Sequence, residues 1–490
     1  MSAPRSRSGD GAPPAVLIAI VLAVLIGRLI VGSLINLTED EAYYRLWSMT
    51  PALGYYDHPP MIAWWLWLGR HLVGDSPLGV RLLPTLASAA TSFVVFAMAR
   101  EAGASRRVAG VAGVWFNATP LVLGGGFLAV PDAPASLFFS LTLWCALKAR
   151  AGRPLAWWAA AGVAAGLACL SKYSALFLAP GMLLWLGATP EGRGRLRTPG
   201  PWIALLIAVG LFSLNLTWNA EHQWETLAKQ FARISPHRWA PGHLVEFLVT
   251  QFVLLNPLIA IFTAAGIVLR RRPGAIDPRP FILVGAPFAV YLLIHSLHDR
   301  VQAHWPAPLY SLAVVVALAG AERLAGRRPW RWVAVGVPIV GVAAAAAMGA
   351  VLALPGGDFG RLDPALSVRG WDPFVARLDA LRAQNGAAWI GTASYGLASQ
   401  LLAEPKVKAP VFQIAERDRW EGMAPSPPAL SKPGVVVDLS RRLDGRRLAG
   451  CFARVRPLGD IVRGDPGEPG KHYAAFAVSG PKNDLLRAGC

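Results

Sequence analysis

The sequence has few charged residues for its length. Only 16% of its 490 residues are Asp, Glu, Lys or Arg, whereas a soluble domain carries about 25%. Hydrophobic residues make up 54% of the chain. They occur in blocks about as long as the 20 residues that a helix needs to cross a bilayer. The shortage of charge and the long apolar blocks together exclude a soluble protein.

Cysteine is also scarce, and no Cys-x-x-Cys or Cys/His pattern typical of zinc sites occurs among the four cysteines. Cys145 and Cys169 fall inside apolar blocks, where a thiol is expected to pack as a small apolar group. Cys451 and Cys490 lie near the C-terminus. They can pair if that region is exposed to an oxidising compartment, which their spacing does not decide.

The net charge of +18 raises the question of nucleic-acid binding. Most Lys and Arg residues stand in short clusters between apolar blocks, as the positive-inside rule predicts for cytoplasmic loops of membrane proteins. Such clusters fit a rim that faces anionic lipid. We therefore expect membrane lipid and no nucleic acid as a partner.

The apolar blocks predict an all-α polytopic membrane domain over residues 1–354, with about eleven transmembrane helices. The first block is too long for a signal peptide and no small-residue cleavage site follows it. Alternation of the basic clusters predicts a cytoplasmic N-terminus in a bacterial inner membrane. The predicted spans are 14–34, 79–99, 108–129, 133–149, 154–170, 174–188, 200–219, 244–269, 280–296, 305–322 and 331–354.

The apolar run from 155 to 186 is interrupted only at residues 171–173. One helix of that length would extend about 48 Å at 1.5 Å per residue, which exceeds one crossing. It would also place the arginines of 193–197 outside the cell. We therefore predict two spans that turn at Lys172, close to the outer face.

An odd number of spans leaves residues 355–490 on the periplasmic side, where their mixed composition predicts a small soluble α/β domain. Short apolar segments at 388–390, 435–437 and 474–476 are typical of strands, whereas 374–382 and 397–403 favour helices.

The predicted outer loop at 36–77 holds the most informative residues. Three acidic residues, Glu39 to Glu41, directly follow the first span, and the string Tyr55-Tyr56-Asp57-His58-Pro59-Pro60 comes after them. The Trp-rich stretch 61–72 favours a helix at the membrane interface. The acidic run also fits an ordinary helix start, because carboxylates stabilise a first turn.

These residues resemble the membrane glycosyltransferases of the GT-C fold. Asp40-Glu41 is similar to their Asp-Glu signature, and the Tyr-Tyr-Asp-His-Pro-Pro string resembles the bacterial branch that includes the aminoarabinose lipid A transferase and relatives of protein O-mannosyltransferases. The strings at 130–134, 170–173 and 304–307 also resemble segments of that family. The resemblance covers about residues 36–310.

The resemblance implies transfer of a sugar from a polyprenyl-phosphate carrier to a lipid, glycan or protein acceptor at the periplasmic face. A lipid-phosphate leaving group needs cations, and an acceptor hydroxyl needs a carboxylate base. Asp40 matches the family's catalytic position, and Asp132 is expected across the same cavity. The candidate catalytic residues are Asp40 and Asp132. The candidate substrate-binding residues are Glu41, Tyr44, Asp57, His58, Lys172, Tyr173, Arg233 and Arg300.

Other interpretations remain open at this point. Lys172 could snorkel to the interface and Asp132 could cap a helix. No cofactor is expected, although a structural divalent metal stays open. A lipid-linked sugar transporter or flippase is the main alternative function. It would be expected to show broken helices in two related halves, and the sequence shows no such symmetry.

Overall fold

A computed structural model describes residues 13–150, 154–232, 239–270, 274–353, 368–420, 430–464, 470–482, 485 and 489–490. The chain divides into two compact units. The first contains residues 1–32, 57–62 and 81–346, and the second contains 33–56, 63–80 and 347–490. The second unit therefore combines most of the predicted outer loop with the C-terminal region.

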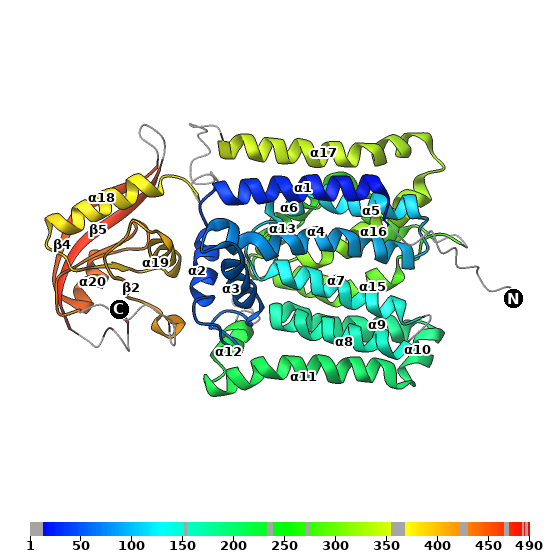
Figure 1. Ribbon diagram of the computed structural model, residues 1–490, viewed down its shortest axis with the longest axis horizontal. Coiled ribbons are helices and arrows are strands. Elements are labelled where there is room, and N and C mark those ends of the chain that lie inside the picture. Colours follow the sequence, from blue (N-terminus) through cyan, green and yellow to red (C-terminus); the bar gives the residue numbers. More distant parts are fainter. Residues whose placement is uncertain are drawn as a thin grey trace. The chain divides into compact units, whose positions relative to one another are not determined.

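The first unit is a bundle of helices whose long members run in a common direction (Figure 1). Six described helices are long and apolar enough to cross a membrane, which makes the chain a multi-pass membrane protein: α1 (Ala15–Leu34), α4 (Pro77–Glu101), α8 (Pro154–Ser171), α11 (Pro199–Glu221), α16 (Ala307–Leu324) and α17 (Arg328–Ala353). The shorter helices are α5 (Arg106–Asn117), α6 (Pro120–Gly125), α7 (Asp132–Lys148), α9 (Leu178–Ala188), α10 (Pro190–Leu196), α12 (Glu225–Ala232), α13 (Gly242–Leu254), α14 (Pro257–Val268) and α15 (Arg279–His295), with a 3₁₀ turn, η1, at Tyr173–Phe177.

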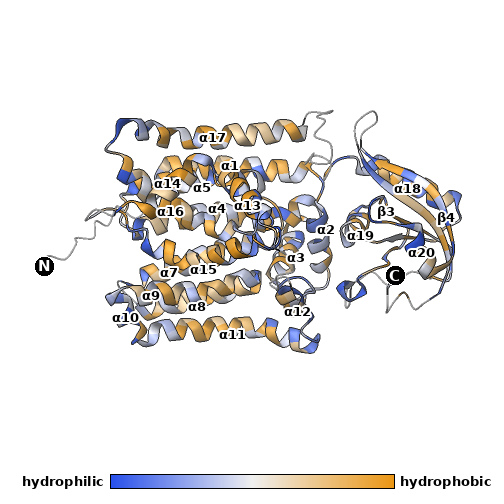
Figure 2. Cartoon of the chain, turned by 180° about the vertical axis from the view of Figure 1, so that it is seen from behind, coloured by the Kyte–Doolittle hydropathy of each residue, from blue (hydrophilic) through white to orange (hydrophobic). Residues whose placement is uncertain are grey.

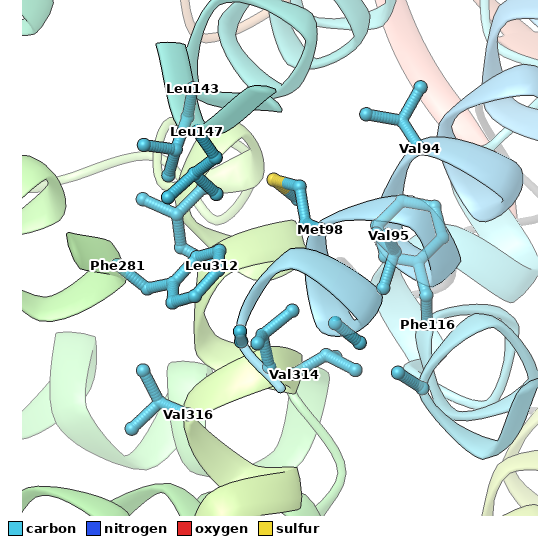
Figure 3. Packing of buried hydrophobic residues seen from close by; sticks show 14 of the residues in the cluster. Val94, Val95, Met98, Phe116, Leu143, Leu147, Phe281, Leu312, Val314 and Val316 are labelled. Atoms are coloured by element: carbon cyan, nitrogen blue, oxygen red, sulfur yellow. The ribbon is translucent and has the colours of Figure 1, made fainter. Parts of the chain in front are cut away.

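Apolar side chains lie both inside and outside this bundle. Helices α4, α5, α7, α15 and α16 contribute a buried core that includes Met98, Phe116 and Phe281 (Figure 3). The outer surfaces of α11 and α17 expose large apolar residues such as Leu206 and Ile339, and hydrophobic colour covers these helices (Figure 2). A helix that is apolar on every side is typical of a lipid environment.

The loops that carry the basic clusters meet at one end of the bundle. Lys148 pairs with Glu101 at 3.4 Å, and Arg195 donates to the carbonyl oxygen of Ala149 at 2.8 Å. The chain after α9 has therefore returned to the end where α7 finishes. Since α8 ends at Ser171 and η1 begins at Tyr173, the predicted turn at Lys172 is confirmed.

Two predicted spans are wrong as single helices. The segment 108–129 contains α5 and α6, which are separated before Pro120. The segment 244–269 contains α13 and α14, which meet at an angle of 106°. A proline lacks the backbone N–H that would continue a helix and disfavours helical geometry at the preceding residue. Pro120 and Pro257 therefore begin new helices.

Asn256 stabilises the break between α13 and α14. Its φ of 77° lies in the left-handed region, which asparagine tolerates better than most residues. The fully buried side chain donates to the carbonyl oxygens of Ala118 and Val337 at 3.1 and 3.0 Å and accepts from the backbone N–H of Leu258. One side chain thus ties the break to two other segments of the bundle.

Arg28 in α1 is a charged residue inside the bundle. A snorkelling side chain would extend to the interface, but Arg28 is buried. Its guanidinium donates to Ser88 Oγ at 2.9 Å and to the carbonyl oxygen of Val122. It therefore connects α1 to α4 and α6 inside the bundle.

The second unit contains α2 (Glu39–Trp47), most of α3 (Met61–Val73) and a five-stranded sheet in the order β2-β1-β3-β5-β4. β1 pairs in parallel with β2 and β3, and β5 pairs in antiparallel with β3 and β4. The strands are β1 (Trp389–Thr392), β2 (Val411–Gln413), β3 (Gly434–Leu439), β4 (Phe452–Arg463) and β5 (Lys471–Pro481). The helices are α18 (Trp371–Gln384), α19 (Tyr395–Ala403), α20 (Gly445–Cys451) and a 3₁₀ turn, η4, at Arg417–Trp420.

Strands β1, β2 and β3 are buried on both faces of the sheet, whereas much of β4 is exposed. Val435 and Val437 pack with α18 and α19, whereas Val436 packs with α20 on the opposite face. This alternation is the period of two that a strand imposes on its side chains. The strands expected around 389, 436 and 475 and the helices expected at 374–382 and 397–403 are confirmed. Cys451 and Cys490 form a disulfide.

The Asn256 break gives a stability prediction. Asn256→Ala should lower the melting temperature in detergent, because it leaves two buried carbonyl groups without their donor and places a Cβ-bearing residue in the left-handed region. Asn256→Gly relieves only the backbone cost, so it should fall between Ala and wild type. Equal melting temperatures for the Gly variant and the wild type would contradict a role for the side-chain hydrogen bonds.

Candidate functional site

A buried ion pair lies where α7 begins and α8 ends. Lys172 Nζ donates to Asp132 Oδ1 at 2.6 Å, and the two side chains are only 11% and 7% exposed. Pro131 occupies the N-cap of α7 and Asp132 is the first helical residue, so Asp132 is not the capping residue. Lys172 is turned inward and does not snorkel to the interface. The protein itself therefore supplies the anion that compensates this lysine.

Two histidines add to the charge around Asp132. His304 Nε2 lies 3.7 Å from Asp132 Oδ2, and His58 is close enough to act on the same carboxylate electrostatically. The structure thus brings together residues of the four strings at 55–60, 130–134, 170–173 and 304–307. His304 was not among the predicted site residues, although its string of residues was recognised.

Asp57 is fixed by α12. Its carboxylate forms an ion pair with Lys229, and its carbonyl oxygen accepts a hydrogen bond from Gln230 Nε2 at 2.9 Å. Lys229 and Gln230 are separated from Asp57 by 172 and 173 positions of the sequence, respectively. Lys229 and Gln230 therefore hold the Asp57-His58 segment in place. No pattern in the sequence predicted these two contacts with Asp57.

Tyr173 belongs to a polar network beside the Lys172 turn. Its hydroxyl donates to Asn215 Oδ1 at 2.8 Å and accepts from Asn219 Nδ2 at 3.3 Å. Asn215 and Asn219 are fully buried in α11. Hydrogen bonds of this kind fix one side chain relative to another within a membrane bundle. Tyr173 thus anchors the turn that presents Lys172.

Of the two predicted arginines, Arg300 pairs with Glu246 and not with this cluster. Arg300 Nε lies 2.9 Å from Glu246 Oε1, and the side chain of Arg300 is 67% exposed. Arg233 lies outside the described residues.

The acidic run at 39–41 begins α2 in the second unit. Thr38 Oγ1 accepts from the N–H of Glu41 at 3.3 Å, while Glu41 Oε2 accepts from the N–H of Thr38 at 2.9 Å. This reciprocal pair is a capping box. Glu41 is fully buried, so its carboxylate serves the helix start. Tyr44 is buried and lies edge-on to Trp47, with ring centroids 4.9 Å apart.

Asp40 points in a different direction from Glu41. Its Oδ1 accepts a hydrogen bond from the hydroxyl of Tyr395 at 3.0 Å, and it is only partly buried. Tyr395 is the first residue of α19 in the C-terminal sheet region. No sequence pattern indicated Tyr395, which is separated from Asp40 by 355 residues.

Asp75 connects the two helices of the outer loop. It accepts hydrogen bonds from Arg45 of α2 at 2.6 and 2.8 Å and from Arg70 of α3 at 2.8 and 2.9 Å. Burial alone would raise the pKa of Asp75, but the hydrogen bonds and charges of Arg70 and Arg45 lower that pKa to about 2. The carboxylate is therefore ionised at neutral pH, and it holds α2 against α3.

Metal ligands do not converge in the described part of the chain. Within it, no three His, Cys, Asp or Glu side chains are grouped as a metal ion would require.

Sequence comparisons confirm the resemblance to polyprenyl-phosphate-dependent glycosyltransferases. Residues 57–218 match a family described as dolichyl-phosphate-mannose-protein mannosyltransferase. The chain is 30% identical over 288 residues to the lipid A galacturonosyltransferase RgtD of Rhizobium johnstonii, an alignment that covers 57% of this chain and 59% of that relative. It is also 28% identical over 138 residues to the undecaprenyl phosphate-α-4-amino-4-deoxy-L-arabinose arabinosyl transferase 2 of Pseudomonas fluorescens, covering 27% of this chain and 24% of that protein. The chain thus spans 59% or less of these curated relatives.

A solved structure shows the same fold over nearly the whole chain. ArnT from Cupriavidus metallidurans, in a crystal structure bound to undecaprenyl phosphate, superimposes with a TM-score of 0.62 at 16% identity. The superposition covers 97% of this chain and 98% of that one. The predicted GT-C-like arrangement of membrane helices is therefore confirmed.

The buried ion pair predicts strong coupling between its two members. Lys172→Met and Asp132→Leu should each lower the melting temperature, because each leaves one buried charge without its partner, at a cost of about 3–5 kcal/mol. The double variant should be more stable than either single variant, because no buried charge remains. Thermal unfolding in detergent gives the melting temperatures of the wild type, the two single variants and the double variant. Additive destabilisation in the double variant would show that the two charges are not coupled.

Proposed function

We propose that this protein is a glycosyltransferase that moves a sugar from a polyprenyl-phosphate carrier to an acceptor at the outer face of a bacterial inner membrane. The observation that carries the proposal is the buried ion pair of Lys172 and Asp132 in the first unit, with His304 and His58 near the carboxylate. Buried charges in a membrane bundle are costly and typically mark a functional site.

The cations of this cluster suit the phosphate of the donor. As the sugar leaves, negative charge develops on the phosphate oxygen, and a nearby ammonium or imidazolium stabilises it. Asp132 holds Lys172 in place before the donor arrives. The donor phosphate then becomes a second anion for Lys172, which has three N–H donors. Arg300 is more exposed than Lys172 and would contact the donor phosphate only at the surface of the protein.

Asp40 is the proposed catalytic carboxylate. In the reaction, an acceptor hydroxyl forms a bond to the anomeric carbon of the sugar, and the bond from that carbon to the phosphate oxygen breaks. The electron pair remains on the polyprenyl phosphate, and the hydroxyl proton passes to Asp40. Attack from the face opposite the phosphate inverts the anomeric centre. For a phosphate acceptor no proton needs removal, and Asp40 would orient the acceptor.

A lipid is the acceptor class that the relatives favour. The name of RgtD specifies lipid A as the acceptor and galacturonic acid as the sugar, and the second relative is named for transfer of an aminoarabinose from undecaprenyl phosphate. These names do not fix the sugar for this chain, and a glycan or a protein is the alternative class of acceptor.

The proposed topology has about eleven crossings in residues 1–354, a cytoplasmic N-terminus and a periplasmic α/β domain in residues 355–490. The gathering of basic loops at one end of the first unit supports it. The disulfide between Cys451 and Cys490 adds support, because disulfides persist in the periplasm and are rare in the cytoplasm.

The activity itself is testable with purified protein. Radiolabelled polyprenyl-phosphate sugars, prepared as a panel, are incubated with the full chain in detergent and bacterial envelope lipids. Transfer of label to an extractable lipid is the expected result. Asp40→Asn keeps the size of the side chain but loses the charge, so its turnover should fall by about 10²–10⁴-fold with an unchanged melting temperature.

The outcomes of this assay separate the alternatives. With the same protein reconstituted in vesicles, movement of labelled carrier across the bilayer without any new glycosidic product would indicate a flippase. Near wild-type turnover by Asp40→Asn would remove Asp40 from the mechanism and make Asp132 the leading candidate.

The topology is testable with C-terminal reporters. An alkaline phosphatase fused after Cys490 should be active, because phosphatase folds only after export. A green fluorescent protein fused there should be dark. Cys451 and Cys490 should also resist a membrane-impermeant thiol reagent until a reductant is added. An inactive alkaline phosphatase fusion together with a fluorescent green fluorescent protein fusion would overturn the odd number of crossings.

A further inference from the structure

The first turn of α2 is held by the C-terminal part of the chain, within the second unit. Asn36 Nδ2 donates to the carbonyl oxygen of Val368 at 3.2 Å, and Gln400 Nε2 donates to the carbonyl oxygen of Leu37 at 2.6 Å. The contacts begin before α2 and continue into its acidic run. The proposed catalytic helix is therefore attached to the sheet region at several successive residues.

The two residues that begin α2 face the first turn of α19. The side chain of Glu39 lies so close to Gly396 that a Cβ added there would come within 2.6 Å of Glu39 Oε2. Asp40 accepts the hydrogen bond from Tyr395. A helix N-terminus favours negative charge because its N–H groups point outward. The start of α19 therefore suits the acidic start of α2.

Tyr395 is itself placed by the sheet. β1 ends at Thr392, and the carboxylate of Asp438 at the end of β3 binds the turn that follows. Asp438 Oδ2 accepts from the N–H groups of Ala393 and Ser394 at 3.0 and 2.7 Å and from Ser394 Oγ at 2.8 Å. Asp438 is fully buried. The turn before Tyr395 is thereby fixed relative to two strands.

The ring of Tyr395 is held from the other side by Arg419 in η4. The guanidinium carbon lies 4.3 Å from the centroid of the Tyr395 ring, 4.9 Å from Tyr56 and 5.5 Å from Tyr43. Arg419 is only 5% exposed and pairs with Glu416 at 3.0 Å. Cation–π contacts are stronger when they are desolvated. One arginine thus packs α2, the Tyr-Tyr string and α19 together.

We infer that Tyr395 is a positioning residue for the glycosyl transfer: its hydroxyl orients the carboxylate of Asp40, and Arg419 keeps the Tyr395 ring in place. This inference rests on the proposed function, in which Asp40 acts on the acceptor. A hydroxyl that donates to a carboxylate stabilises its charged form and limits its rotation. The C-terminal region then takes part in catalysis by fixing the geometry of a residue it does not contain.

Several other titratable groups lie near Asp40 in this unit. Glu39 and Glu41 stand on the same helix, Arg419 lies behind Tyr395, and Lys471 of β5 interacts with Glu39. None of these changes when the Tyr395 hydroxyl alone is removed. Tyr395→Phe therefore isolates one hydrogen bond.

The decisive measurement is the pH dependence of turnover in the transfer assay, with the full chain. Tyr395→Phe should lower kcat about 10-fold at neutral pH, leave KM for the donor unchanged and move the acidic limb of the kcat profile upward by about half to one pH unit. The direction follows because the lost donor had favoured the charged carboxylate. Arg419→Met should also lower kcat, because the Tyr395 ring loses the guanidinium that packs on it.

Matched variants separate this role from a loss of stability. Tyr473→Phe removes another tyrosine hydroxyl in the same sheet, one that accepts from Arg463, and Arg456→Met removes a guanidinium that binds Asn385. Both should keep the wild-type pH profile whatever their melting temperatures. A wild-type kcat and pH profile for Tyr395→Phe, beside an inactive Asp40→Asn, would overturn this inference and leave the proposed function standing. Full activity of Asp40→Asn would overturn both.

Discussion

The structure depends on the requirement that every charge buried in the bundle has a partner. The Lys172 ammonium and the Asp132 carboxylate are nearly inaccessible and lie 2.6 Å apart. Removal of either from water would be costly without the other. The pair therefore constrains the geometry of the first unit, because the start of α7 and the end of α8 must meet. Asp57 and Lys229 apply the same constraint to the loop string and α12.

Such pairing also suits the proposed binding of a donor phosphate at this site. An unpaired lysine at this depth would disturb the empty protein, whereas a lysine held by one carboxylate is already placed and keeps further N–H donors for a second anion. His304, at 3.7 Å from Asp132, varies the charge of the cluster with its protonation. The cluster can therefore be stable without substrate and still favour a negatively charged leaving group.

Much of the first unit was predictable because the positive-inside rule and the bilayer thickness act on sequence directly. The turn at Lys172 followed from the length of the apolar run and from the arginines at 193–197, which belong on the cytoplasmic side. Pro120 and Pro257 were local signals for breaks, since a proline often begins a new helix. The apolar stretches around them were nevertheless long enough to be predicted as single spans. The pairing of Lys172 with Asp132, 40 positions apart in the sequence, was not predictable. It depends on how α7 and α8 are rotated about their axes.

The acidic loop shows the same division between local and tertiary information. Neighbouring helical residues diverge by about 100°, which is why Asp40 and Glu41 face different sides. The Thr38-x-x-Glu41 spacing was a readable capping box. Tyr395 and Arg419 carried no signal, because nothing in a single sequence relates residue 40 to residues 395 and 419.

The length of α2 explains why this tertiary support is needed. The helix has nine residues, and isolated helices shorter than about 12–15 residues are marginal in water. Its capping box and its Arg45–Asp75 contact are local, and they fix the helix only against the outer loop. The proposed role of Asp40 as proton acceptor requires a rigid neighbour that orients its carboxylate. The sheet is such a neighbour, because Asp438 locks the turn before Tyr395 and the strands bury apolar side chains on both faces. The C-terminal region thus gives a short acidic helix the rigidity that its own sequence cannot supply.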